Sequence, residues 1–271
     1  MTLALSLVLV AILLLLALGA GLYAFQEVLL LYPRRLPAGH DFGLPDVHEV
    51  AIPVPGAVLS ALHLRLPDPD GLVFFLHGNS GHAGDWIGDT QFYRAANVDV
   101  FVLDYRGFGK SSGRVRSEAQ LRADVAAAWA WVAPQYAGRY RVMLGRSLGT
   151  ALVAGLAAQL GLQPEAPAMP DRCILVSPYW SIRELARRFY PYAPGALLRY
   201  PLETWRDLPR VPVPVTLIHG DLDALIPLAH AQRLQALVPR AELVTITGAA
   251  HNDLQDFAQY LGALAARVRP A

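Results

Sequence analysis

The stretch YRVMLGRSLGTALVAGLAAQL, residues 140–160, decides the fold that we expect for this chain. It begins with the pattern of a buried strand and ends with that of a buried helix. The turn between them reads GRSLG, a GxSxG motif whose Gly145 and Gly149 let strand and helix approach closely around a strained Ser147. The stretch predicts a nucleophilic serine exposed above a sheet. It also fits an ordinary strand-to-helix turn with Ser147 near the helix N-cap.

Strand and helix patterns alternate along the rest of the chain. The expected strands are EVAIPV, LSALHLRL, LVFFLHG, VDVFVLDY, YRVMLG, CILVSPY, PVTLIHG and ELVTIT, and the expected helices cover residues 85–96, 117–132, 150–160 and 228–237, with a last one from about 252. This alternation predicts an α/β fold, with a mostly parallel central sheet and helices on both faces. Prolines and aromatic residues interrupt it over residues 181–210, which indicates a short insertion or lid.

The N-terminal segment carries no charged residue in the 24 positions from Thr2 to Phe25. As a helix it would be about 36 Å long, enough to cross a bilayer. A cleaved signal peptide is the alternative, but the segment lacks a basic start and its apolar stretch is too long. We therefore expect a single transmembrane anchor at 1–26, a tether rich in proline and glycine at 27–47, and one folded domain at 48–271. Arg34 and Arg35 favour a cytoplasmic domain by the positive-inside rule.

The composition argues against two classes of protein. Lys and Arg number 23 and Asp and Glu 22, so the net charge of +1 gives no long-range field that would collect nucleic acid. Cys173 is the only cysteine, which excludes an intramolecular disulfide, and no Cys/His cluster suggests a metal site. We expect the chain to bind neither nucleic acid nor metal.

A base and an acid that could activate the serine follow at later strand ends. Asp223 comes after the strand PVTLIHG, and His251 after ELVTIT. A serine hydroxyl is a weak nucleophile that needs a base, and the base needs an acid to orient it. The order Ser147, Asp223, His251 therefore predicts a catalytic triad at one sheet edge. Asp221 is a second candidate acid, and each residue could instead cap a nearby helix.

The triad chemistry also needs two N–H groups where negative charge develops. One is the amide of Leu148, directly after the serine. The other is the amide of Asn79, in the loop after LVFFLHG, where Gly78 would let the backbone approach. The residues around Asn79 also fit a plain turn.

The loop DYRGFGKSSG, residues 104–113, superficially resembles a phosphate-binding loop. A Walker motif needs glycine at position 104, where this chain has Asp104. We interpret the loop as structural and expect Arg106 to pair with Asp104 or with a neighbouring carbonyl.

Five segments in order, FFLHGNSG, VFVLDYRGFGKSSG, LGRSLGT, LIHGDLDALIP and GAAHND, resemble the α/β-hydrolase superfamily over about residues 48–266. Within it the chain is most similar to membrane-anchored serine hydrolases with a small lid. The resemblance implies Ser147 as nucleophile, His251 as base, Asp223 rather than Asp221 as acid, and Asn79 and Leu148 as oxyanion donors. Similar proteins act as esterases, lysophospholipases, thioesterases or peptidases.

From these residues we predict a serine hydrolase that cleaves carboxylic esters through an acyl-enzyme, without metal or cofactor. Its substrate would be a small-molecule or lipid ester, and the N-terminal helix would hold it at a membrane. A peptidase, thioesterase or acyltransferase could use the same triad, and a non-catalytic tethered scaffold could keep the fold. The aromatic segment 187–205 either lines an acyl pocket or packs on the sheet.

Overall fold

The computed structural model describes residues 2–88, 90–162, 169–191 and 195–270. Among these, eight strands form one sheet in the order β10-β9-β8-β7-β4-β6-β3-β2. Their bounds are β2 Val47–Val54, β3 Ala57–Leu64, β4 Gly71–Leu76, β6 Val98–Leu103, β7 Tyr140–Arg146, β8 Arg172–Val176, β9 Val215–Gly220 and β10 Glu242–Ile246. The strands β4 and β6 to β10 pair in parallel, while β3 pairs antiparallel with both β2 and β6. The expected mostly parallel sheet is confirmed.

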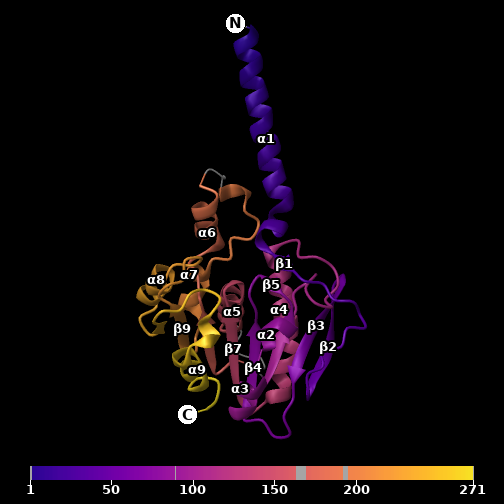
Figure 1. Cartoon of the computed structure of the whole chain (residues 1–271), viewed down its shortest axis with the longest axis vertical. Helices are drawn as coiled ribbons and strands as arrows, with labels where there is room; N and C mark the ends of the chain where they lie inside the picture. Colours follow the sequence, from indigo (N-terminus) through magenta and orange to yellow (C-terminus); the bar gives the residue numbers. More distant parts are fainter. Residues whose placement is uncertain (1, 89, 163–168, 192–194, 271) are drawn as a thin grey trace.

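Helices cover both faces of the sheet (Figure 1). One face packs against α4 Glu118–Val132, α5 Leu148–Leu160 and α8 Ala229–Leu237, and the other against α2 Ala83–Ile87, α3 Thr90–Ala95 and α9 Ala258–Ala265. Two of the short 3₁₀ turns are η1 Ala133–Tyr136 and η4 Leu254–Asp256. Successive side chains of a strand point to opposite faces of the sheet. In β4, Phe74 packs on the face covered by α4, α5 and α8, and Phe75 packs on the face covered by α2, α3 and α9.

The single helix expected over residues 85–96 is two helices, α2 and α3. Gly88 has φ +59°, a left-handed conformation that ends α2, and residue 89 lies outside the described residues.

The N-terminal helix α1, Thr2–Leu30, projects away from the domain (Figure 1). Its segment Leu3–Leu30 is long and apolar enough to cross a membrane. The helix ends four residues beyond the expected boundary at 26, because the apolar pattern continues through Leu30 and Glu27 finds a cationic partner in Arg199. Beyond it, β1 Tyr32–Pro33 pairs with β5 Ser80–Gly81, so part of the expected tether lies against the domain.

The helix α6 of the interrupted segment 181–210 lies beside the base of α1 (Figure 1), and we refer to the whole segment as the lid. Its elements are α6 Ile182–Phe189, η2 Gly195–Leu197, α7 Thr204–Asp207 and η3 Leu208–Arg210, and residues 192–194 of it lie outside the described residues. Ser181 caps α6 by accepting a hydrogen bond from the Glu184 N–H.

The loop after β6 confirms one part of the prediction for Arg106, because this residue donates to a nearby carbonyl, but its carboxylate partner is not Asp104. Arg106 makes a two-pronged ion pair with Asp124 of α4, with N–O distances of 2.6 and 2.8 Å, and also donates to the Pro55 carbonyl. Asp104 instead accepts the Ala83 N–H at the start of α2. The partner Asp124 lies 18 residues after Arg106, and local sequence gives no sign of this pairing.

A buried polar chain lies at the edge of the core beneath β3. His63, 1% exposed, has its Nε2 2.8 Å from the Tyr136 hydroxyl, which donates to Asp99. Because the Tyr136 hydroxyl donates to Asp99, it accepts the Nε2–H of His63. Burial, with the nearby charges of Arg65 and His48, lowers the pKa of His63 from 6.5 to about 4.

Because the pKa of His63 is lowered, we expect the folded protein to lose stability in mild acid. Below pH 6.5 the unfolded chain binds a proton at His63 that the native chain binds only near pH 4. The free energy of unfolding should therefore fall by up to about 3 kcal/mol as the pH decreases through this window. Thermal unfolding of the full chain in detergent at pH 7 and pH 4.5 tests this, and His63→Gln should narrow the difference. His48→Gln should narrow the difference only slightly, because His48 is exposed, lies opposite His63 in the sheet and contributes the smallest of the three causes that lower the pKa of His63. An equal pH effect in wild type and His63→Gln would contradict the prediction.

Candidate active site

Ser147 lies between the end of β7 and the start of α5, in a left-handed conformation with φ 50° and ψ −113°. The two glycines of the motif make this turn sterically feasible. A Cβ at Gly149 would lie 1.9 Å from the Leu76 carbonyl oxygen, and a Cβ at Gly145 would lie 2.6 Å from the Gly149 oxygen. Any larger residue at either position would push strand and helix apart.

Asp223 lies in the loop after β9 and His251 in the loop after the neighbouring strand β10, and their side chains are in contact. The His251 Nδ1 lies 2.7 Å from Asp223 Oδ2, and the other Asp223 oxygen accepts the N–H groups of Leu225 and Ile226. Burial alone would raise the pKa of Asp223, but hydrogen bonds from His219, His251 and the Ile226 N–H outweigh it and hold the pKa well below its usual range. Asp223 is therefore an anion at neutral pH, and it fixes the imidazole with Nε2 as the free nitrogen.

Asp221 has a different role. Its side chain is exposed and accepts the Gly248 N–H at 2.7 Å, which joins two loops at the sheet edge. Of the two candidate acids, Asp223 is the one that the fold brings to His251.

The loop after β4 carries the second expected oxyanion donor, Asn79. Its backbone oxygen accepts the Tyr32 N–H at 2.7 Å, and its side chain donates to the Leu30 carbonyl at 2.9 Å. Leu148 is the first residue of α5, where amides have no intrahelical acceptor. A Cβ on Gly78 would lie 2.9 Å from the Trp86 ring and 3.9 Å from Ser147 Cβ, so the loop passes close to the serine.

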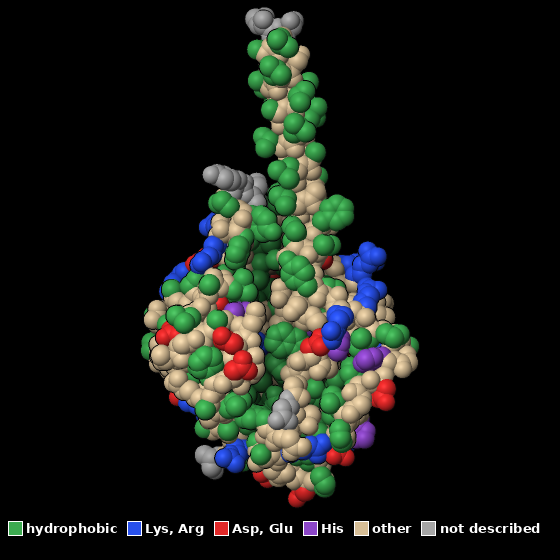
Figure 2. Space-filling model, in the orientation of Figure 1, with side chains coloured by type: hydrophobic (Ala, Val, Ile, Leu, Met, Phe, Trp, Pro, Cys, Tyr) green, Lys and Arg blue, Asp and Glu red, His purple; other side chains and the backbone are tan. Residues whose placement is uncertain are grey.

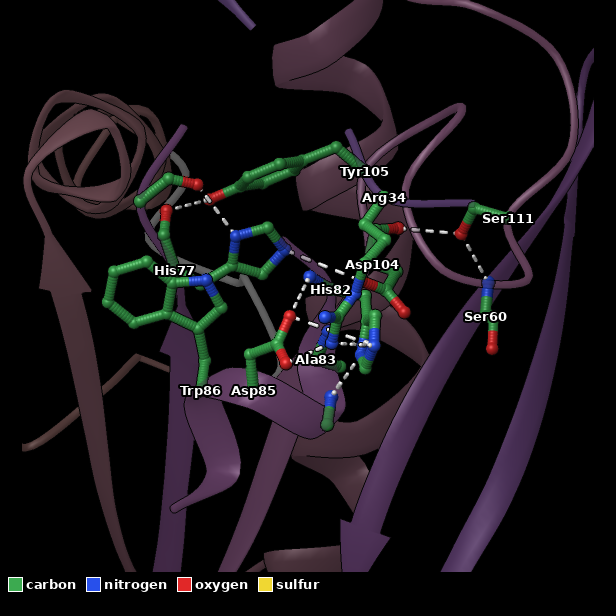
Figure 3. A network of polar contacts seen from close by, with 12 residues as sticks. Arg34, Ser60, His77, His82, Ala83, Asp85, Trp86, Asp104, Tyr105 and Ser111 are labelled. Atoms are coloured by element: carbon green, nitrogen blue, oxygen red, sulfur yellow. Dashed lines mark hydrogen bonds and ion pairs between the residues drawn. The ribbon is translucent and has the colours of Figure 1, made fainter. Parts of the chain in front are cut away.

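A buried network braces this loop from below (Figure 3). Tyr105 donates its hydroxyl to the His77 carbonyl at 2.8 Å, and the His77 Nδ1 lies 2.7 Å from the Gly78 carbonyl oxygen. On the other side of the His77 ring, Nε2 lies 3.5 Å from Asp104 Oδ1. The His77 ring also stacks on Trp86, with centroids 5.9 Å apart. These contacts position Gly78 and leave little freedom to the loop.

Two positioning residues escaped prediction. Arg146 donates to the His251 carbonyl at 2.7 Å and lies over the Trp86 ring, so it ties the histidine loop to the serine turn. His219 lies within β9 and approaches Asp223 Oδ2 at 3.4 Å, with its Nε2 2.7 Å from the Ile226 oxygen. Both residues act through contacts with other parts of the chain, which local sequence does not reveal. The one signal in the sequence is the position of Arg146 inside the GxSxG motif.

A cavity of about 490 Å³ opens above the serine. Ser147, His251, Asn79 and Leu148 all line it, so the predicted site residues converge on one space. Its other walls come from the lid and from the last turn of α1, and Figure 2 shows hydrophobic side chains along the hollow between these two elements. Phe189 and Tyr190 of the aromatic segment are among the lining residues.

Known proteins resemble this chain in sequence and in fold. The sequence model described as "Serine aminopeptidase, S33" matches residues 67–199. The α/β hydrolase domain-containing protein 17C of Xenopus tropicalis is 31% identical over 214 residues, which cover 76% of this chain and 64% of that protein. The chain belongs to the α/β-hydrolase superfamily. Protein bem46 of Schizosaccharomyces pombe, 29% identical over 76% of this chain and 72% of its own length, is another relative of this α/β hydrolase.

Solved structures show the same fold. An esterase from Pyrococcus furiosus superposes with a TM-score of 0.65 at 18% identity, covering 88% of this α/β hydrolase and 96% of the esterase. A monoacylglycerol lipase from Paleococcus ferrophilus gives a TM-score of 0.58 at 19% identity, covering 78% and 98%. At identities of 18% and 19%, these matches show that the fold is shared. The reaction has to be inferred from the residues of the site.

Proposed function

We propose that this α/β hydrolase is a serine hydrolase that cleaves carboxylic esters, with lipid esters as its substrate class. The observation that carries the proposal is the 2.7 Å contact of His251 with an ionised Asp223, on the wall of the cavity that contains the strained Ser147. A base that is oriented by an anion beside a serine on a sharp turn is the arrangement that serine acylation needs.

In the proposed mechanism, His251 Nε2 takes the proton of Ser147 Oγ as this oxygen attacks the ester carbonyl. The amides of Leu148 and Asn79 stabilise the negative charge that develops on the carbonyl oxygen. Proton return from His251 releases the alcohol and leaves the acyl group on Ser147. Water, activated by the same imidazole, then attacks the acyl-enzyme and frees the acid. Asp223 stabilises the imidazolium in both steps and keeps its own charge.

The cavity favours an ester over an aminoacyl substrate. An aminopeptidase must bind the charged α-ammonium group, which calls for a carboxylate on the wall. Among the described lining residues, Glu27 is the one acid, and it is already ion-paired with Arg199 and hydrogen-bonded to Tyr200. The apolar side chains from α1 and the lid instead suit an acyl chain.

We also propose that α1 anchors the chain in a membrane with the catalytic domain on the cytoplasmic side. Arg34 and Arg35 are exposed and follow the last residue of the helix, Leu30, within five positions. Positively charged segments beside a span remain on the cytoplasmic face.

A fluorescent fluorophosphonate and a panel of matched substrates test the proposal on the full chain in detergent. We expect labelling of the wild type and turnover of p-nitrophenyl butyrate, with slower turnover of the matched amide. A thioester preferred over the ester would redirect the substrate class. If a folded wild type neither reacts with the probe nor hydrolyses any substrate, a non-catalytic scaffold replaces the proposal.

A further inference from the structure

The anchor helix itself forms a wall of the candidate active site. Leu29 and Leu30, at the end of α1, line the cavity that contains Ser147 and His251. The same end of the helix also positions the oxyanion loop, because the Leu30 carbonyl accepts the Asn79 side chain. A helix that only tethered the domain would not contribute to the substrate cavity.

A second, smaller cavity of about 80 Å³ continues the first one along α1, between the helix and the lid. The two cavities share four lining residues: Leu29, Leu30, Ala186 and Tyr190. The smaller cavity extends as far as Leu22, about 12 Å along the helix axis from Leu30 at 1.5 Å per residue. We treat these two adjoining cavities as one groove, which starts at Ser147 and ends beside the apolar segment of α1. We call it the anchor groove.

One face of α1 is turned towards the lid. Gly19, Leu22, Gln26 and Leu29 recur at spacings of three and four, as residues on one helical face do. A Cβ on Gly19 would be in van der Waals contact with Leu197, 3.7 Å away, and the next three residues line the groove.

A polar latch holds this face against the lid. Gln26, 5% exposed, donates to the Leu197 carbonyl at 3.0 Å and accepts the Arg199 N–H at 2.7 Å. Glu27 forms an ion pair with Arg199 and accepts the Tyr200 hydroxyl. An unpaired amide or carboxylate near the bilayer would be costly, so these bonds couple anchor and lid into one unit.

We propose that the anchor groove binds the acyl chain of a membrane lipid ester, which reaches Ser147 sideways from the bilayer. The proposal rests on the proposed ester hydrolysis at Ser147. A ligand that fills the groove needs a reactive carbonyl at the serine end and a long apolar chain beside α1, and these are the two parts of a long-chain ester. Because the groove ends beside the membrane-spanning segment, the chain's far end can stay in lipid. Burial of its methylenes then favours long chains over short ones.

Chain-length preference in nanodiscs tests the groove. The measured quantity is the ratio of the hydrolysis rates of p-nitrophenyl palmitate and butyrate by the full chain. We expect Leu22→Trp, which fills the far end of the groove, to lower this ratio about tenfold or more, since extra volume in a fitted apolar site is poorly tolerated. Leu16→Trp is the matched control, because Leu16 is exposed on another face of the same helix. It should keep the wild-type ratio.

A direct measurement avoids any dependence on a variant that folds poorly. A fluorophosphonate with a sixteen-carbon chain and a terminal diazirine would first label wild-type Ser147 and then, on irradiation, crosslink to α1 residues 19–30 or to the facing lid. Crosslinks only elsewhere in the domain, or an unchanged ratio in a folded Leu22→Trp, would overturn the groove while leaving ester hydrolysis intact. Absence of any label on the wild type would instead count against the proposed function.

Discussion

Replacing Ser147 by alanine is expected to reduce the hydrolysis of p-nitrophenyl butyrate by about 10⁴-fold or more and to abolish fluorophosphonate labelling. The change removes the hydroxyl of Ser147, which lines the same cavity as His251, while the methyl group of alanine fits the same backbone. The initial rate of the full chain in detergent, corrected for uncatalysed hydrolysis, measures the loss. His251→Ala should give a similar loss, because the two residues act as a unit and their effects do not add.

Ser177→Ala is the matched control for that experiment. Ser177 is also buried and also has a positive φ, 51°, at the end of the neighbouring strand β8, yet it does not line the candidate site cavity. Its variant should retain labelling and turnover. If Ser147→Ala kept a tenth or more of the wild-type rate, or if labelling moved to another serine, the nucleophile would lie elsewhere.

The fold could be predicted because its determinants are local. Buried parallel strands appear as short apolar runs, and the GxSxG turn carries its own steric requirement in Gly145 and Gly149. The break at Gly88 was missed, because a glycine inside a helical pattern indicates a stop only when its φ is known. The helix α1 also continues four residues past the expected anchor, and the ion pair of Glu27 with Arg199 in this extension joins residues too far apart in sequence to be foreseen.

The site could be predicted in part. Parallel strands place their carboxyl ends at one sheet edge, so chain order alone brings Ser147, Asp223 and His251 to the same region. Family resemblance favoured Asp223, and the hydrogen bond to His251 agrees with that choice. The contact between Leu30 and Asn79 could not be foreseen, since it joins residues 49 positions apart through a backbone carbonyl, which leaves no trace in side-chain identity.

The contact between Leu30 and Asn79 connects the N-terminal segment to the candidate active site. A tether would leave the domain's chemistry unchanged when removed, whereas here β1 pairs with the strand β5 that follows Asn79, and the last turn of α1 lines the cavity that contains Ser147. The membrane segment and the candidate active site are therefore parts of one structure, and measurements on the full chain are the ones that report on its specificity.

Asp223→Asn is expected to lower the rate of ester hydrolysis by about 10³- to 10⁴-fold with little effect on folding. The asparagine oxygen can still accept the N–H groups of Leu225 and Ile226, so the loop keeps its conformation. Its NH₂ group, however, would donate to His251 Nδ1 and drive the imidazole proton to Nε2, where the base must be free to take the serine proton. The lost negative charge also no longer stabilises the imidazolium. Initial rates and the thermal unfolding midpoint, measured on the same preparation, separate the chemical effect from the structural one.

Asp221→Asn is the matched control, two residues away in the same loop. Its oxygen can still accept the Gly248 N–H, and its side chain does not contact His251, so the rate should stay within about twofold of wild type. Because hydrogen bonds hold the pKa of Asp223 well below its usual range, its carboxylate stays charged in mild acid, and its contribution to stability is lost only as the pH falls below about 4. Any decline in the wild-type rate between pH 7 and pH 5 should therefore have a cause other than protonation of Asp223. Equal losses in Asp221→Asn and Asp223→Asn would show that the loop, and not the charge beside His251, supports the reaction.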